Sequence, residues 1–300
     1  MPSTVAGVCA VVVAYRPDEA HLCRLLRALR PQVAMGVVVH NGTPSALAHE
    51  ARALGFEWLD LGANLGVAEA FNRGVAHAMQ RGATFVLLSD QDSLPAEDMM
   101  SALSLAWSEL VASGEPVGAL GPAIVDDRTG SRARILQVSD NGDLRLRAVA
   151  DGGVHEVAYV ISSGCLVPLA ALAHSGAFRC DLFIDYVDIE WCLRCRRQGL
   201  KVFVAGSARL LHNLGERVMR VFGREVPVHS SLRHYYVMRN GVALLRMSWV
   251  ERGWKRYDAW VLMQRLVFHT LFSRPPGVHL VWMLRGLRDG WRGRLGPLRR

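Results

Sequence analysis

The chain has 300 residues, of which 51% are hydrophobic and 21% are charged, and its formal net charge is +8. This composition excludes an intrinsically disordered protein, and the length suffices for one large hydrophobic core or two modest ones. The six cysteines fall mostly within apolar segments and lack the spacing of a secreted disulfide framework, so reduced thiols are expected.

Apolar, strand-like runs alternate with helical patterns through the first two thirds of the chain. The run Val8–Ala14 follows no basic leader and passes directly into Tyr-Arg-Pro, which predicts a strand rather than a signal sequence, and a cytoplasmic protein. Helical patterns at 21–30 and 67–82 suit crossover connections between parallel strands. Further strands are predicted at Gly36–Val39, Phe85–Leu88, Val157–Ile161 and Lys201–Ala205. This alternation predicts an α/β fold with a mostly parallel central sheet covered by helices.

Polar residues follow three of the predicted strands, namely Tyr15-Arg16, Asn41-Gly42-Thr43 and Asp90-Gln91-Asp92. Ligands of such sheets bind beyond the carboxyl ends of the strands, so these groups are expected along one edge. Asp90 and Asp92 are one residue apart and can therefore point to one position. Because like charges raise each other's proton affinity, a divalent cation such as Mg²⁺ or Mn²⁺ is the natural partner. The alternative is a solvated turn in which one carboxylate caps a helix beginning near Pro95.

A second acidic cluster lies at residues 181–194, DLFIDYVDIEWCLR. Glu190 and Arg194 are four residues apart, a spacing that permits an ion pair on a helix. Asp188 has no such partner nearby in sequence and is interpreted either as a helix N-cap or as a functional carboxylate. His212 follows in RLLHNLG, either as a histidine satisfied within a loop or as a ligand.

The positive charge is concentrated at the C-terminal end of the sequence. Residues 251–300 hold eleven Arg or Lys against three acidic residues, together with four of the eight tryptophans. Arginines interrupt every apolar stretch before it reaches the roughly 18 to 20 residues that a bilayer span requires. The spacing at 258–272, followed by Arg-Pro-Pro-Gly, predicts a helix pair lying on a membrane surface rich in anionic lipid. The alternative is a helical lid packed on the main domain, and nucleic-acid binding is disfavoured because no recognition motif is present.

Taken in chain order, eight motifs resemble those of glycosyltransferase family 2, in particular its bacterial rhamnosyltransferase-like members: VAYRPD, VVVHNGT, LGANLGVAEAFNRG, LLSDQDS, SSGCLV, LFIDYVDIEWCLR, LLHNLG and RHYYVMRN. The resemblance runs from about residue 8 to about residue 245. It implies a catalytic domain of GT-A fold over residues 1–225 and a C-terminal helical extension over 226–300. It also implies a metal-dependent enzyme that transfers a sugar from a nucleotide-diphosphate donor with inversion.

The resemblance further implies roles for individual residues. Asp188 matches the catalytic base, and Mg²⁺ or Mn²⁺ is expected at Asp90, Asp92 and His212. The donor is expected to contact Tyr15, Arg16, His40, Asn41, Asn64, Gly66, Asn72 and Asp90. The acceptor side is assigned to Glu190, Trp191, Ser163 and Gly164. Two of these assignments have alternatives, because Glu190 either contacts the acceptor or orients Arg194, and Ser163-Gly164 is equally well a plain turn between strands.

One position departs from the family's pattern. His40 stands where the family usually has the Asp that recognises the pyrimidine base, although a neutral imidazole can still accept a hydrogen bond. The favoured function is transfer of L-rhamnose from dTDP-L-rhamnose to a hydroxyl group of a lipid-linked polysaccharide or glycolipid acceptor, at the inner face of the cell membrane. Two alternative functions stay open: a galactofuranosyl or other hexosyl transferase using a UDP-sugar, and a non-catalytic nucleotide-sugar-binding scaffold of a polysaccharide assembly complex. The oligomeric state is also left open, with a homo-oligomer as one form.

Overall fold

The computed structural model describes residues 7–43, 45–127, 129–139, 143–212, 217–221, 224–228, 230–273 and 277–298. Its centre is a nine-stranded sheet in the order β3-β2-β1-β4-β10-β6-β11-β5, with β9 paired to β11. Strands β1, β2, β3, β4, β6 and β11 run in one direction, and β5, β9 and β10 run in the other. The predicted α/β fold with a mostly parallel sheet is therefore confirmed.

The first part of the chain alternates strand and helix in the predicted manner. Its elements are β1 (Val8–Ala14), α1 (Glu19–Leu29), β2 (Met35–His40), α2 (Ala48–Ala53), β3 (Glu57–Asp60), α3 (Val67–Gln80), β4 (Phe85–Asp90), β5 (Ser93–Pro95) and α4 (Met99–Ala112). The helical patterns at 21–30 and 67–82 are confirmed as α1 and α3. Because β1, β2 and β4 are parallel neighbours, their carboxyl ends meet at one edge of the sheet.

The alternation of side chains along β1 explains why both faces of the sheet are covered. Val11 and Val13 point to the face on which Phe71 of α3 is buried, together with α5, α6 and the C-terminal helices. Ala10 and Val12 point to the other face, where they join leucines of α1 and residues of α2 and α4. Both faces of the strand are buried, which is the reason for its continuous apolar sequence.

The middle of the chain adds the strands that carry the second half of the site. The elements are β6 (Val117–Val125), β7 (Arg134–Val138), β8 (Leu144–Ala148), β9 (Val154–Glu156), β10 (Cys165–Pro168), α5 (Leu169–Ser175), α6 (Val187–Arg197) and β11 (Lys201–His212). The predicted strand at Val157–Ile161 is wrong, because β9 ends at Glu156 and only an isolated bridge joins Val157 to Gln137. Val157 and Val160 are buried, so the apolar character of this run reflects burial in the core and not pairing as a strand.

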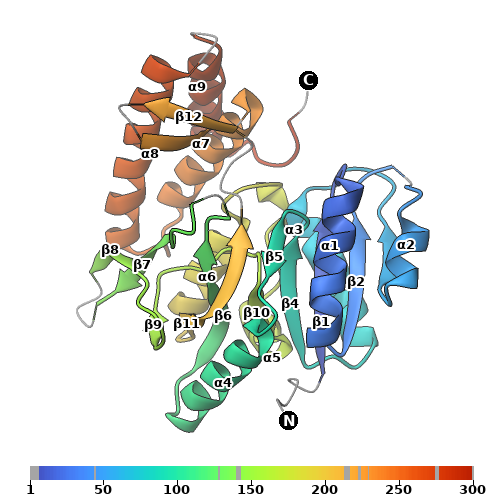
Figure 1. Ribbon diagram of the computed structural model, residues 1–300. Coiled ribbons are helices and arrows are strands. Elements are labelled where there is room, and N and C mark those ends of the chain that lie inside the picture. The colour runs from blue at the N-terminus through green and yellow to red at the C-terminus, as the bar shows by residue number, and fades with distance from the viewer. Residues whose placement is uncertain are drawn as a thin grey trace.

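The C-terminal part consists of the hairpin β12 (Arg217–Val221) and β13 (Arg224–Val228), followed by α7 (Ser231–Arg246), α8 (Arg252–Phe272) and α9 (Val278–Trp291). The three helices gather at one end of the molecule, away from α1 and α2 (Figure 1). A Cβ on Gly286 or Gly290 would lie 2.4 Å from a carbonyl oxygen of α7, so α9 packs directly on the backbone of α7. The predicted helix pair is confirmed as α8 and α9, whereas the domain boundary at 225/226, which falls within β13, stays a prediction.

One face of the helix pair belongs to the protein core. Trp254 and Leu262 of α8 and Met283 of α9 are at most 5% exposed and join the cluster that covers the sheet. This packing agrees with the alternative in which the helices form a lid on the main domain, as far as this one face is concerned. None of the helices in the described ranges combines the length and the hydropathy needed to cross a bilayer.

Candidate active site

Two carboxylates from distant parts of the chain meet at the turn that precedes β10. Asp90, at the end of β4, accepts a hydrogen bond of 2.7 Å from the Ser163 hydroxyl group and a longer one of 3.4 Å from the Ser162 hydroxyl group. Asp188, in the first turn of α6, accepts hydrogen bonds from the backbone N–H groups of Ser162 at 3.2 Å and of Ile189 at 2.8 Å. Ser162 therefore touches both carboxylates, and the turn joins two motifs that sequence reasoning expected to act together.

Neither acidic motif serves as a helix cap. The N-cap of α4 is Asp98, so the alternative in which Asp90 or Asp92 caps the following helix is wrong. The N-cap of α6 is Tyr186, and Asp188 lies two residues further on, inside the first turn. The capping alternative for Asp188 is therefore also wrong.

Burial dominates the electrostatics of this junction. Desolvation raises the pKa of Asp90, and the neighbouring charge of Asp92 raises it further, while the hydrogen bond from Ser163 opposes both effects. Burial likewise raises the pKa of Asp188 to about 6, opposed by the backbone N–H of Ile189. The charge of Asp90 raises the pKa of Asp188 further, so the two carboxylates are close enough to interact electrostatically. A bound cation would stabilise the ionised forms of both.

Asp92 and His212 have the geometry of two ligands that share a cation. Pairing between β5 and β11 places His212 opposite Ser93, directly beside Asp92. The His212 Nδ1 atom is buried without a hydrogen-bond partner and lies 3.9 Å from the Asp92 carboxylate. This separation is too long for a hydrogen bond, but it fits two ligands that each bind one cation at about 2.1 Å. With Asp90 nearby, the residues present fit Mg²⁺ or Mn²⁺.

Protein side chains alone do not complete such a site. Among the residues that the structure describes, no group of three His, Cys, Asp or Glu side chains is arranged to hold a metal ion. Mg²⁺ commonly binds through one or two carboxylates and takes its other ligands from water and substrate phosphates. The geometry therefore fits a cation that binds together with a phosphorylated substrate.

Gln91, the residue between the two aspartates, has a function that sequence reasoning missed. Its Oε1 accepts a hydrogen bond of 2.7 Å from the backbone N–H of Tyr15, and its Nε2 donates one of 3.1 Å to the Tyr15 carbonyl. This pair of bonds ties the end of β1 to the end of β4. Arg16 next to it has a φ of 48°, a conformation that such a contact helps to hold. Tyr15 and Arg16 are thereby fixed beside Asp90 and Asp92.

The asparagines predicted on the donor side hold backbone together. Asn41 donates to the Asn64 side chain at 3.2 Å, and Asn64 accepts a hydrogen bond from the backbone N–H of Gly66 at 3.0 Å. Asn72 makes two hydrogen bonds of 2.9 Å with the backbone of Phe178. These contacts tie the carboxyl edge of the sheet to α3 and to the segment before α6. Their direct contact with a nucleotide stays a prediction.

His40, the position that departs from the family's pattern, forms a pair with a residue that sequence reasoning did not select. Its Nδ1 lies 2.9 Å from the carboxylate of Asp60, which ends the neighbouring strand β3, and its ring stacks on Trp58. The Nε2 atom faces Gly42, since a Cβ on that glycine would lie 3.4 Å from it. An imidazole and a carboxylate thus occupy the place where the family usually has one carboxylate.

The residues assigned to the acceptor side are largely inside the protein. Glu190 is 1% exposed and binds both Nε and Nη2 of Arg194 at 2.9 to 3.0 Å, which supports the second of its two predicted roles, orienting that arginine. Trp191 is also 1% exposed and donates to the Gly176 carbonyl, so its ring lies in the core and not on an acceptor-facing surface. Gly164 has a φ of 75° and closes the turn that carries Ser163.

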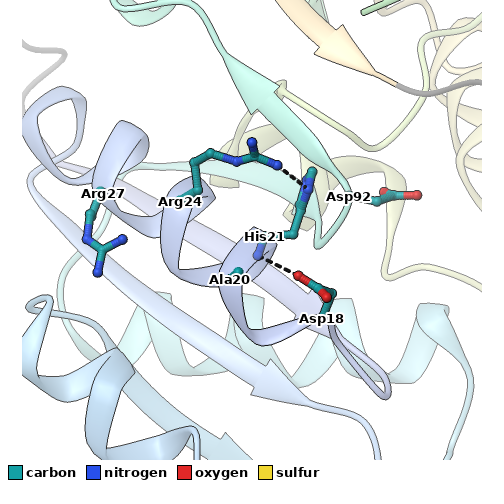
Figure 2. Close-up of a pocket in the computed structure, with 6 residues that line it drawn as sticks. All are labelled: Asp18, Ala20, His21, Arg24, Arg27 and Asp92. Carbon is teal, nitrogen blue, oxygen red and sulfur yellow. Dashed lines mark hydrogen bonds between the residues drawn. The ribbon is translucent and has the colours of Figure 1, made fainter.

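A surface depression of about 520 Å³ adjoins Asp92. Figure 2 shows its lining, which apart from Asp92 comes from α1 and its N-cap: Asp18, Ala20, His21, Arg24 and Arg27. His21 lies between Arg24, whose guanidinium contacts its Nδ1 at 2.8 Å, and Asp18, which accepts its backbone N–H. The polar edge of the sheet therefore continues past Asp92 onto α1.

Comparison with known proteins identifies relatives with named activities. The chain is 31% identical over 247 residues to the dTDP-rhamnosyl transferase RfbF of Shigella flexneri, a match that covers 82% of each chain. It is 26% identical to the galactofuranosyltransferase GlfT1 of Mycobacterium tuberculosis, over 90% of this chain and 98% of that protein. No family model matches the chain.

Solved structures with the same fold include two that were determined with UDP or a UDP-sugar. GalNAc-T7, determined with UDP, GalNAc and Mn²⁺, superposes with a TM-score of 0.56 at 10% identity, covering 91% of this chain and 59% of that one. Residues 1–349 of S. aureus TarS in complex with UDP-GlcNAc superpose with a TM-score of 0.55 at 15% identity, covering 94% and 80%. At these identities the likeness shows the fold, which is GT-A.

Replacing Ser163 by alanine tests whether the turn supports cation binding. Ser163→Ala removes the short hydrogen bond that orients the Asp90 carboxylate, and the loss of such a supporting contact typically weakens metal affinity by about 10- to 100-fold. Ser162→Ala is the matched control, because its hydroxyl group is 3.4 Å from the same oxygen. Mn²⁺ affinity measured by electron paramagnetic resonance should fall about tenfold or more in Ser163→Ala and change little in the control. Equal affinities in the two variants would contradict this role.

Proposed function

The chain belongs to the GT-A glycosyltransferases, and within this family we propose that it transfers L-rhamnose from dTDP-L-rhamnose to a hydroxyl group of a lipid-linked saccharide acceptor. The proposal includes membership of family 2, inversion at the anomeric carbon and dependence on Mg²⁺ or Mn²⁺. The observation that carries it is the meeting of Asp90 and Asp188 at one turn, in a chain 31% identical to a dTDP-rhamnosyl transferase over 82% of its length.

Asp188 is the proposed general base. An acceptor hydroxyl group is a poor nucleophile, and a positioned carboxylate that takes its proton typically contributes about 10²- to 10⁴-fold to the rate. The N–H groups of Ser162 and Ile189 fix the orientation of this carboxylate. Burial raises its pKa to about 6, which strengthens it as a base while leaving it largely ionised at neutral pH. Direct attack by the activated hydroxyl group on the face opposite the leaving diphosphate inverts the anomeric carbon.

Asp90, Asp92 and His212 are the proposed ligands of the cation. The cation, when bound, offsets the negative charge that grows on the departing diphosphate. The protein contributes a further positive charge, because Arg233 at the start of α7 lies close enough to lower the pKa of Asp90. Arg233 is held by Asp185, whose carboxylate it contacts at 3.1 Å. Tyr15 and Arg16, fixed by Gln91, border the same place and are proposed to contact the nucleotide.

The His40–Asp60 pair is proposed to read the pyrimidine base. When the Asp60 carboxylate accepts the Nδ1 proton, Nε2 of His40 is left as a hydrogen-bond acceptor. An acceptor is what the N3–H group of a pyrimidine such as thymine or uracil requires. Since both bases share this edge, His40 selects pyrimidines of this kind, and the preference for a dTDP-sugar rests on the rhamnosyl transferase relative.

The outer face of the helix pair is proposed to lie on an anionic membrane, where a lipid-linked acceptor resides. It exposes the apolar side chains Trp260, Met263, Val267, Leu271, Val281, Leu284 and Trp291. The four apolar residues of α8 recur at helical spacing and form one stripe. Within residues 252–273 and 277–298 the two acidic residues, Asp258 and Asp289, are 3% and 5% exposed, whereas Arg256 and Arg288 are exposed. A face with apolar and basic side chains and without exposed carboxylates suits anionic headgroups.

A panel of nucleotide sugars tests the donor assignment. With Mg²⁺ present, dTDP-L-rhamnose should bind and undergo slow hydrolysis more efficiently than UDP-galactofuranose or UDP-glucose, and chelation of the cation should weaken binding of each. Calorimetry and release of the nucleotide measure the two effects without an acceptor. Preference for UDP-galactofuranose would move the assignment to the activity of the GlfT1 relative, and failure to bind any nucleotide sugar would end the proposal.

Asp188→Asn tests the base. Transfer should fall by about 10² or more because the base acts in the transition state, while the dissociation constant of the donor changes less than threefold. In the unchanged protein, kcat/KM should decrease as the pH drops below about 6, where Asp188 becomes protonated and loses its function as a base. A variant with near-normal transfer, or a profile without an acidic limb down to pH 5, would remove Asp188 from this role.

Vesicle sedimentation tests the membrane face. The double variant Trp260→Ser/Leu271→Ser removes two exposed side chains of the α8 stripe and should reduce binding to vesicles of phosphatidylcholine and phosphatidylglycerol about tenfold or more. The matched control is Leu105→Ser/Val111→Ser, which removes two apolar residues of α4 that are 63% and 53% exposed. The control should bind as the unchanged protein does. Equal binding of the two variants, or no preference for anionic over neutral vesicles, would count against the assignment.

A further inference from the structure

The segment that leads into the catalytic helix has a strained backbone. Phe183, Asp185 and Tyr186 have φ angles of 67°, 60° and 63°, in the left-handed region that non-glycine residues rarely occupy. Such conformations persist only where the surrounding structure holds them. Tyr186 is the N-cap of α6, and Asp188 lies in its first turn. The position of the Asp188 carboxylate therefore depends on what holds residues 182–186.

Asn240 of α7 makes the contacts that hold this segment. Its Nδ2 group shares its two hydrogens among the carbonyl oxygens of Leu182 at 2.9 Å, Ile184 at 2.8 Å and Asp185 at 2.9 Å. The side chain is 0% exposed, so water does not compete for these carbonyl groups. A single amide group thus gathers three carbonyls around the turn, and an extended or helical backbone would not present them to one point.

Arg239, the residue before it, supports the same contact from one side. It is 1% exposed, donates to the Leu182 carbonyl at 2.8 Å, and contacts the Asn240 side-chain oxygen at 2.9 Å. It also donates to the carbonyl of Gly296, whose own N–H donates to the Asp181 carbonyl at 2.6 Å. The chain beyond α9 is therefore attached to the same turn.

Contacts from other elements complete the enclosure of the turn. The Tyr186 hydroxyl group donates to Asp258 of α8 at 2.8 Å, in a buried contact. On the side of the sheet, the backbone N–H of Val67 donates to the Phe183 carbonyl at 2.7 Å, and a Cβ on Gly66 would lie 2.6 Å from that oxygen. From the side of α7, Asn240 and Arg239 donate to the carbonyls of Leu182, Ile184 and Asp185.

We propose that Asn240, supported by Arg239, is a positioning residue for Asp188. It keeps Phe183, Asp185 and Tyr186 at the positive φ angles that start α6 where Asp188 reaches the N–H of Ser162. This makes α7 part of the catalytic apparatus, in addition to any role of the C-terminal helices at a membrane. The inference rests on the proposed role of Asp188 as the base. The direct contacts of Asn240, at Leu182, Ile184 and Asp185, lie outside the proposed donor side, which is built mainly on β1, β2 and β4.

Asn240→Ala in the full-length protein tests this inference. Transfer should fall about 50-fold or more in kcat, because the turn relaxes and Asp188 leaves its position, while the dissociation constants for dTDP and for the donor change less than threefold. Ser273→Ala is the matched control, because it removes a buried hydrogen bond of 2.9 Å to His269 at the end of α8, away from the turn and from Arg239. It should keep kcat within about threefold even if its melting temperature falls as far as that of Asn240→Ala.

Several outcomes would overturn the inference. If Asn240→Ala keeps normal kcat, or loses donor affinity as much as kcat, or if Ser273→Ala loses as much kcat, then Asn240 has only a general structural role. If circular dichroism shows that Asn240→Ala is unfolded, Asn240→Ser, which retains one donor, must show the same loss of kcat at constant donor affinity. Asp188→Asn measured in parallel separates the two claims. Normal transfer in Asp188→Asn would reject the proposal that Asp188 is the base. An inactive Asp188→Asn together with a fully active Asn240→Ala would reject only the positioning role of Asn240.

Discussion

The site depends on two half-buried carboxylates being held close together against their mutual repulsion. Asp90 and Asp188 come from β4 and α6, and both are bound by the turn at Ser162-Ser163. Each hydrogen bond to a charged group contributes about 1.5 to 3 kcal/mol, which offsets part of the desolvation that raises both pKa values. The same desolvation makes Asp188 a stronger base and disfavours the ionised form of Asp90, which suits the different tasks proposed for the two carboxylates.

The strained backbone before α6 is stabilised by contacts from several surrounding elements. Three left-handed residues before α6 cost about 1 kcal/mol or more each, and the buried hydrogen bonds of Asn240 and Arg239 offset that cost. Gly66 is required opposite them because a side chain there would collide with Phe183. The motifs LGANLGVAEAFNRG and RHYYVMRN, which lie far apart in the sequence, therefore enclose one turn from two sides.

The sequence predicted the elements whose signals are local and missed those that depend on pairing. Alternation of apolar runs and amphipathic helices was sufficient for α1, α3 and the parallel strands, because both faces of β1 are buried. It failed at Val157–Ile161, where an apolar run is buried without pairing as a strand. The acidic motifs were identified by type and spacing, but Gln91, Asp60 and Asn240 were not, because their functions come from partners more than 15 residues away. Burial of Trp191 was equally invisible, since an aromatic residue beside an acidic motif suits a core or a binding surface.

Helix α8 carries both the proposed membrane face and a contact to residues 182–186, the turn before α6. Asp258 points inward, where its carboxylate accepts the Tyr186 hydroxyl group, and Trp260, two residues later, is 55% exposed on the outer face. Residues two apart on a helix project about 200° from each other, so one turn of α8 carries both contacts. Burial raises the pKa of Asp258 to about 6, so its ionised form is costly and relies on the tyrosine for stabilisation. The hydrogen bond between Tyr186 and Asp258 is therefore a contact through which a displacement of α8 would reach the turn that places Asp188.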